Sequence, residues 1–203
     1  MGLLLPALSI AGIKEDLGYA ELASVLGSSL PDGGTVAVLQ VEAGNNFAPD
    51  SANAEFVGKT FQDLSNPVSA APSGHATGVG SKFYGLTSSM TPAITDIAIY
   101  GVNSFLFEFL NFGTSASPDA LNSRVANHSW VGGYLVDSNG DDVPASTSNV
   151  LRRLDWLIEE DEFVHVAAPN NGLSGIKPLI TSAYNVMTVG RTDANHLSTV
   201  AAL

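Results

Sequence analysis

The run Thr35 to Val41 (TVAVLQV), followed directly by Glu42-Ala43-Gly44, decides the fold. Its apolar and β-branched residues are continuous, which is typical of a strand covered on both faces, as in a parallel sheet. A carboxylate at the tip of such a strand is poorly placed for a purely solvated charge. Glu42 is therefore predicted to have a partner, for which histidine is the natural choice. The alternative is an acid that simply leaves into a loop.

Further apolar runs repeat this pattern along the chain. Strands are predicted at Ile94 to Tyr100, Arg124 to Trp130, Phe163 to Ala168 and Asn185 to Val189. Between them, residues 148–160 place apolar side chains at helical spacing and are predicted to form a helix. Alternating strands and helices indicate an α/β fold with a doubly wound, mostly parallel sheet. In such sheets the ligand site lies beyond the carboxyl ends of the strands.

Two units are predicted along the chain. Residues 1–34 form an N-terminal extension with a short helix at 17–26, and residues 35–203 form the α/β domain. The first twelve residues are apolar, but they lack a basic stretch and contain Pro6. A buried or partner-covered segment is therefore favoured there over a signal peptide.

Composition excludes several classes of function. With 20 acidic and 8 basic residues the net charge is −12, which argues against a nucleic-acid partner or an anionic membrane. The absence of cysteine excludes disulfides, thiolate metal sites and a cysteine nucleophile. No stretch reaches the roughly 18 apolar residues that span a bilayer. The acidity suits a secreted or extracellular protein, although no clear signal peptide identifies the compartment.

Two further polar residues stand among small ones. His75 lies in Ser73 to Gly80 (SGHATGVG), whose small side chains leave an imidazole accessible. Asn170 follows a predicted strand in Ala167 to Gly172 (AAPNNG), where its amide could donate to a developing oxyanion. The alternatives are a structural role for His75 and an ordinary Pro-Asn-Gly turn around Asn170.

The order of these segments resembles the subtilase family, the subtilisin-like serine peptidases, over roughly residues 35 to 193. Glu42-Ala43-Gly44 stands where the family has Asp-Thr/Ser-Gly, and His75 to Gly80 is similar to its His-Gly-Thr-His-Val-Ala-Gly, one residue shorter and without the second histidine. Residues 125–132 (VANHSWVG) match its substrate-lining strand, and residues 167–172 its oxyanion segment. Residues 183–190 (AYNVMTVG) resemble the strand that follows.

The resemblance implies a serine endopeptidase that acts on a polypeptide, with no metal or cofactor in the reaction. Glu42 would orient the imidazole, His75 would be general base and acid, and Asn170 would donate to the oxyanion. The residues that would line the bound substrate are Asn127, Ser129, Trp130 and Gly132. The chain departs from the family pattern at two positions. Glu42 is one methylene longer than the family's aspartate, and Pro169 lacks the backbone N–H that the family's glycine has there.

The nucleophile of the family lies in a Gly-Thr-Ser block after the oxyanion asparagine. No such block follows Asn170, so the chain is expected to end before the nucleophile, with an incomplete sheet at its C-terminal end, and to be inactive alone. The run Gly113 to Pro118 (GTSASP) imitates the block, but it precedes the asparagine and is predicted to be a loop. The alternative function is a non-catalytic, subtilase-like domain that binds peptide or protein. The oligomeric state stays open.

A calcium site is a further candidate in the loop Asp137 to Asp142 (DSNGDD). Oxygen atoms of Asp137, Asn139 and Asp141 would supply the ligands, as in a D-x-N-x-D loop. The twelfth position would be Ser148 instead of glutamate, so an acidic turn before a helix is the favoured alternative.

Overall fold

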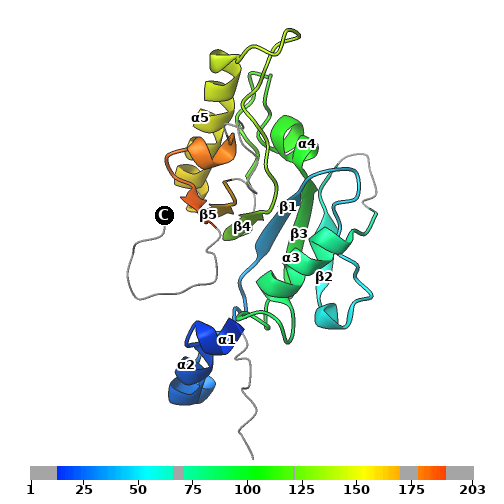
Figure 1. Cartoon of the computed structure of the whole chain (residues 1–203), viewed down its shortest axis with the longest axis vertical. Coiled ribbons are helices and arrows are strands. Elements are labelled where there is room, and N and C mark those ends of the chain that lie inside the picture. The colour runs from blue at the N-terminus through cyan, green and yellow to red at the C-terminus, as the bar shows by residue number, and fades with distance from the viewer. Residues whose placement is uncertain (1–12, 66–70, 121, 170–177, 191–203) are drawn as a thin grey trace, which may run out of the picture.

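The fold is known from a computed structural model, which describes residues 13–65, 71–120, 122–169 and 178–190. Its centre is a six-stranded sheet in the order β2-β3-β1-β4-β5-β6, with every neighbouring pair parallel (Figure 1). The strands are β1 Val38–Glu42, β2 Thr60–Asp63, β3 Asp96–Gly101, β4 Val125–His128, β5 Val164–Ala167 and β6 Met187–Thr188. The predicted α/β class with a parallel sheet is confirmed.

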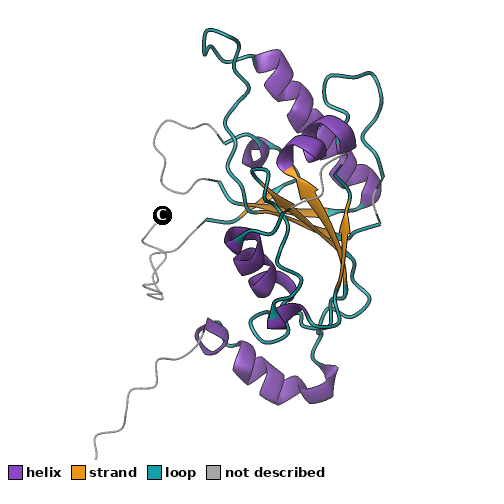
Figure 2. Ribbon diagram, turned by 90° about the vertical axis from the view of Figure 1, so that its right-hand side faces the viewer, coloured by secondary structure: helices purple, strands orange, loops and turns teal. Residues whose placement is uncertain are grey.

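Helices cover both faces of the sheet, as a doubly wound arrangement requires (Figure 2). The helices are α1 Ile13–Asp16, α2 Tyr19–Leu26, α3 Gly74–Tyr84, α4 Val102–Ser104 and α5 Pro144–Asp161. A π-helical turn, Phe105–Phe109, continues α4, and short 3-10 turns occupy Gly27–Ser29, Ala54–Phe56 and Ile180–Ser182. α3 lies on one face of the sheet, and α4 and α5 lie on the other.

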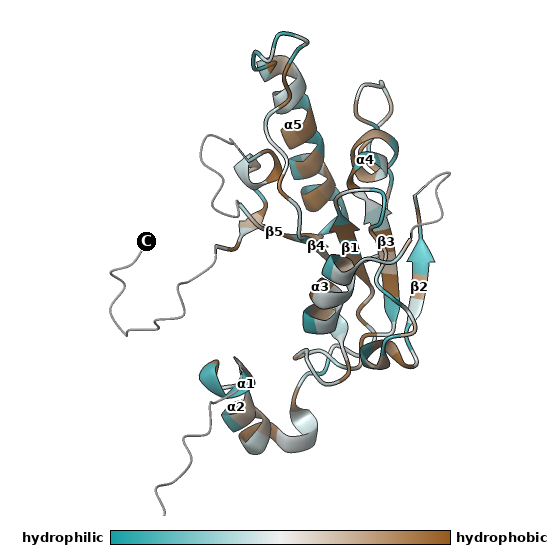
Figure 3. Cartoon of the chain, turned by 45° about the vertical axis from the view of Figure 1, so that its right-hand side comes forward, coloured by the Kyte–Doolittle hydropathy of each residue, from teal (hydrophilic) through white to brown (hydrophobic). Residues whose placement is uncertain are grey.

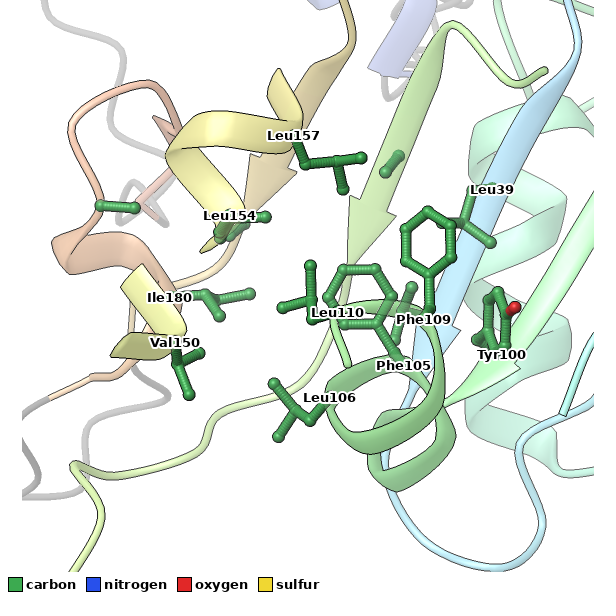
Figure 4. Close-up of a cluster of buried hydrophobic side chains, with 14 of the residues drawn as sticks. Leu39, Tyr100, Phe105, Leu106, Phe109, Leu110, Val150, Leu154, Leu157 and Ile180 are labelled. Carbon is green, nitrogen blue, oxygen red and sulfur yellow. The ribbon is translucent and has the colours of Figure 1, made fainter. Parts of the chain in front are cut away.

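The strand β1 is buried at every position and contributes to a separate apolar cluster on each face. On the α5 side, Leu39 and Val41 pack in the larger cluster with aromatic residues of the π-helical turn (Figure 4). On the α3 side, Val38 joins the smaller cluster with Phe56 and Tyr84. The continuous apolar pattern of β1 therefore has the predicted cause, which is burial on both faces.

Some boundaries differ from the predicted ones for local reasons. β1 begins at Val38, because a turn in which the Val36 amide donates to the Gly33 carbonyl precedes it. The edge strand β2 was not predicted, because its side chains are mostly exposed and polar, in contrast to the hydrophobic β1 and β3 (Figure 3). α5 begins at Pro144, since proline is well suited to the first turn of a helix.

The N-terminal extension contains the expected helix, α2, which ends before Gly27 and has no buried residue. Side chains of α1 and α2 tie the extension to the segment after α3. The Lys14 ammonium group donates to the Thr87 carbonyl at 2.8 Å, and the Tyr19 hydroxyl donates to the Met90 carbonyl at 3.0 Å. Within the described ranges, no helix has the length and apolar character that crossing a membrane requires.

Candidate active site

The candidate site lies at the carboxyl edge of the central strands. Glu42 is the last residue of β1, and Ser129 directly follows β4, the neighbour of β1 in the sheet. His75 is in the first turn of α3, which begins because the Ser73 hydroxyl accepts a hydrogen bond from the Ala76 amide at 3.0 Å. Neighbouring parallel strands and one helix N-terminus therefore bring these three residues together.

Glu42 and His75 are in contact. Oε2 of Glu42 lies 3.2 Å from Nε2 of His75, and the same nitrogen lies 3.0 Å from the carbonyl oxygen of Ser129. A carbonyl oxygen can only accept a hydrogen bond, so Nε2 is the ring nitrogen that carries a proton. In the neutral imidazole the lone pair is then on Nδ1. The His75 side chain is 65% exposed and that of Glu42 is 1% exposed, so the base meets solvent and its acid does not.

Gln40 also belongs to this site, although it is not a sequence-predicted site residue, because an amide cannot ionise. Its Nε2 donates to Oε1 of Glu42 at 2.8 Å and to the carbonyl of Ala76 at 3.0 Å. Its Oε1 accepts a hydrogen bond from the Tyr84 hydroxyl. The available signal was the spacing of Gln40 and Glu42, since side chains at i and i+2 of a strand share one face.

Burial dominates the electrostatics of Glu42. Loss of solvent raises the pKa of its carboxyl to about 7, although the hydrogen bond from Gln40 and the charge of His75 act in the opposite direction. Burial also raises the pKa of the Tyr84 phenol, so this hydroxyl remains a donor at any physiological pH. At neutral pH the site therefore holds a carboxyl that is close to its own titration midpoint.

A pocket of about 590 Å³ opens beside His75. It is lined by Gly74, His75, Gly78, Val79, Lys82, Phe83, Asn127 and Ser129. The Asn127 side-chain amide donates to the Ser129 hydroxyl at 2.7 Å, which fixes both side chains. A side-chain carbon built at Gly78 would meet no atom within 4 Å, so glycine keeps this part of the pocket wide.

The residues predicted to line the substrate divide into two groups. Asn127 and Ser129 line the pocket, whereas Trp130 is 6% exposed and packs in the cluster on the α5 side. A side-chain carbon at Gly132 would lie 2.6 Å from the Trp130 ring, so glycine is required there for packing. Asn170 lies outside the described residues, which end in this region at Pro169.

The run Gly113 to Pro118 is a loop, as predicted, and it is fastened to α5. The guanidinium of Arg153 donates to the carbonyls of Leu110, Thr114 and Ala116 at distances between 2.7 and 2.9 Å. Arg153 therefore holds the loop on the α5 face of the sheet, opposite α3 and His75.

The loop of the calcium candidate folds as a turn closed by its own backbone. The Asp137 carboxylate accepts hydrogen bonds from the amides of Asn139 at 2.8 Å and Asp141 at 3.0 Å. These backbone bonds, that of Asp141 first, lower the pKa of Asp137. Across the described part of the chain, no group of three or more His, Asp or Glu side chains could hold a metal ion.

Two other histidines, His128 on β4 and His165 on β5, form a buried pair on the opposite face. Nε2 of His128 lies 2.8 Å from Nδ1 of His165, and the indole N–H of Trp130 donates to Nδ1 of His128 at 3.2 Å. The rings are stacked with centroids 5.0 Å apart, beside Phe105. Burial lowers the pKa of both, that of His165 to about 3, so both are neutral.

Comparison with known proteins supports the fold. No known family model matches the chain, and neither does any curated protein sequence. The solved structure of the prenylagaramide maturation protease PagA is similar, with a TM-score of 0.53 and 16% sequence identity over 85% of this chain. The chain spans 59% of the length of that protein. The predicted subtilisin-like α/β fold is thereby confirmed.

Proposed function

We propose that this chain supplies the acid and the general base of a subtilisin-like serine peptidase that hydrolyses polypeptides. The observation that carries the proposal is the contact of 3.2 Å between Glu42 and His75 at the carboxyl edge of the sheet. An exposed imidazole beside a buried acid, at the mouth of a pocket, is the arrangement that a base needs in order to act on a substrate. The likeness to a maturation protease adds support at the level of fold.

In the proposed reaction each residue has a separate task. The nitrogen of His75 that faces away from Glu42 takes the proton of a serine hydroxyl as its oxygen attacks the peptide carbonyl, and later gives that proton to the leaving amine. Glu42 holds the other side of the ring and stabilises the imidazolium. Asn170 donates to the oxyanion, and the substrate strand lies along Asn127 and Ser129.

A non-catalytic peptide-binding domain is the second candidate. It is favoured by the hydrogen bonding of His75, whose described partner is the Ser129 carbonyl and not a hydroxyl. Among the described residues, no serine side chain bonds to the imidazole in place of the nucleophile.

A fluorophosphonate probe, which labels an activated serine covalently, separates the two candidates. We expect the full-length protein to be labelled and the labelling to be lost in His75→Ala and reduced at least about 100-fold in Glu42→Gln. Glu159→Gln is the matched control for removal of a carboxylate, since Glu159 is exposed on α5, across the sheet from His75. It should be labelled like the wild type.

Labelling that persists in His75→Ala would contradict the catalytic proposal. A wild type that remains unlabelled, yet binds peptides with an affinity that depends on Asn127, would favour the binding domain.

A further inference from the structure

We infer that Gln40 is the positioning residue of the site: held by Tyr84, its amide fixes the Glu42 carboxyl so that one oxygen faces His75. This role rests on the proposed function of Glu42 as the acid. The residues that carry it belong to β1 and to both ends of α3, so the contact depends on the packing of this helix on the sheet.

The hydrogen bonds leave the amide one orientation. The Ala76 carbonyl can only accept, so the amide atom of Gln40 that faces it must be the NH₂ group, and Oε1 then accepts from the Tyr84 hydroxyl. Both hydrogens of the NH₂ group have acceptors, Oε1 of Glu42 at 2.8 Å and the carbonyl of Ala76 at 3.0 Å. Turning the amide over would bring its oxygen against the Ala76 carbonyl and the Glu42 carboxylate, which are both acceptors. Gln40 is fully buried, so no solvent would compensate.

This fixed amide settles the geometry of the acid. A glutamate has one more rotatable bond than an aspartate, and an unrestrained carboxyl would sample several orientations. The bond from Gln40 restrains Oε1, which leaves Oε2 as the oxygen that faces Nε2 of His75. In this chain Gln40 therefore compensates for the longer side chain of its acid.

The same bond leaves Oε2 as the carboxyl atom that His75 meets. Oε1 accepts from the Gln40 amide, whereas Oε2 has no hydrogen-bond partner among the described residues and lies 3.2 Å from Nε2 of His75. The hydrogen on Nε2 has the Ser129 carbonyl as its acceptor. Oε2 therefore acts on the imidazole through its charge, which favours the imidazolium when Glu42 is ionised.

The test follows the Glu42 carboxyl by carbon NMR during a pH titration of the full-length protein. The wild-type midpoint is expected near 7, because burial raises this pKa. Gln40→Met keeps a side chain of similar size but removes the donor to the carboxylate, so the midpoint should rise by about one pH unit. Gln62→Met is the matched control, because Gln62 is exposed on the edge strand β2, and its midpoint should not move.

Tyr84→Phe provides a milder second variant, which keeps the ring and removes only the hydroxyl that orients the amide. Its midpoint should move in the same direction by a smaller amount. A folded Gln40→Met or Tyr84→Phe with the wild-type midpoint would overturn the inference. The titration does not depend on hydrolysis. A shifted Glu42 midpoint in a protein that the probe does not label would refute the peptidase and retain the role of Gln40. Probe labelling with an unshifted midpoint would refute the role of Gln40 and retain the peptidase.

Discussion

His75 and the pair His128–His165 place the same side chain in two opposite environments. His75 is 65% exposed, touches an acid and lines a pocket. His128 and His165 are at most 1% exposed and are stacked beside Phe105. Their only described polar partners are each other and the indole of Trp130.

The difference shows what makes an imidazole available for chemistry. Every lone pair of the buried pair is occupied, since the Trp130 N–H requires Nδ1 of His128 as acceptor and Nε2 of His128 must then donate to His165. A proton can enter the pair only if one of these bonds breaks. His75 has a free ring nitrogen in its neutral state and a carboxyl beside it. The two environments should therefore respond differently to mutation and to acid.

The largest expected difference is in stability. His128→Ala would leave a cavity and deprive the Trp130 N–H of its acceptor, so the free energy of unfolding should fall by about 3 kcal/mol. His75→Ala, at an exposed position, should change it by about 0.5 kcal/mol at most. Urea unfolding at pH 7 measures both. Equal losses in the two variants would remove the distinction between them.

Acid should act mainly through the buried pair. The pKa values of these histidines lie below the unfolded value of about 6.5, so the unfolded chain binds more protons below that pH. Stability is therefore complete above pH 6.5 and is lost as the pH falls, by about 1.4 kcal/mol per pH unit for each histidine. Glu42 has the opposite effect on stability between pH 4.5, its ordinary pKa, and about pH 7. In this range its carboxyl is protonated in the folded state and ionised in the unfolded chain, so a fall in pH stabilises the fold.

Urea unfolding at several values between pH 3 and 4.5 separates the two effects, since Glu42 no longer contributes there. His165→Phe should show a slope that is smaller than that of the wild type by about 1.4 kcal/mol per pH unit. Parallel curves would show that the buried histidines are not what makes the fold sensitive to acid.

The smallest effect concerns the indole. Trp130→Phe removes the donor to His128 while keeping an aromatic ring, so stability at pH 7 should fall by about 1 kcal/mol. The substitution also frees Nδ1 of His128 to accept a proton, which raises the pKa of that ring. The variant should then lose less stability in acid than the wild type, and the two urea midpoints should converge. A constant gap at all pH values would exclude this coupling.

Sequence patterns were sufficient to select two residues of the site but not to predict its internal contacts. Glu42 and His75 could be selected because one ends a continuous apolar run and the other stands among small residues. For Gln40 only its spacing from Glu42 was visible, because its decisive partner Tyr84 is 44 residues away and meets it only when α3 packs on the sheet. Such contacts leave no local periodicity in the sequence.

Trp130 illustrates a second limit. It lies in the segment that resembles a substrate-lining strand, and the structure buries it on the other side of the sheet with His128. Both faces of β4 are occupied, so neither alternation nor apolar character indicates which face meets the pocket. The neighbouring Asn127 and Ser129 were selected together with Trp130, from the same resemblance, and of these three residues only they line the pocket.

Gln40 and Glu42 also carry information about how β1 pairs with its neighbours. The other residues of the strand are apolar on both faces, so hydrophobicity alone would accept a pairing shifted by one residue. That shift would turn both polar side chains into the cluster around Phe105, away from Ala76, Tyr84 and His75. An unpaired buried polar group costs about 1–3 kcal/mol, so the shifted pairing is strongly disfavoured. Gln40 and Glu42 thus also specify the register in which the central strand β1 pairs with its neighbours.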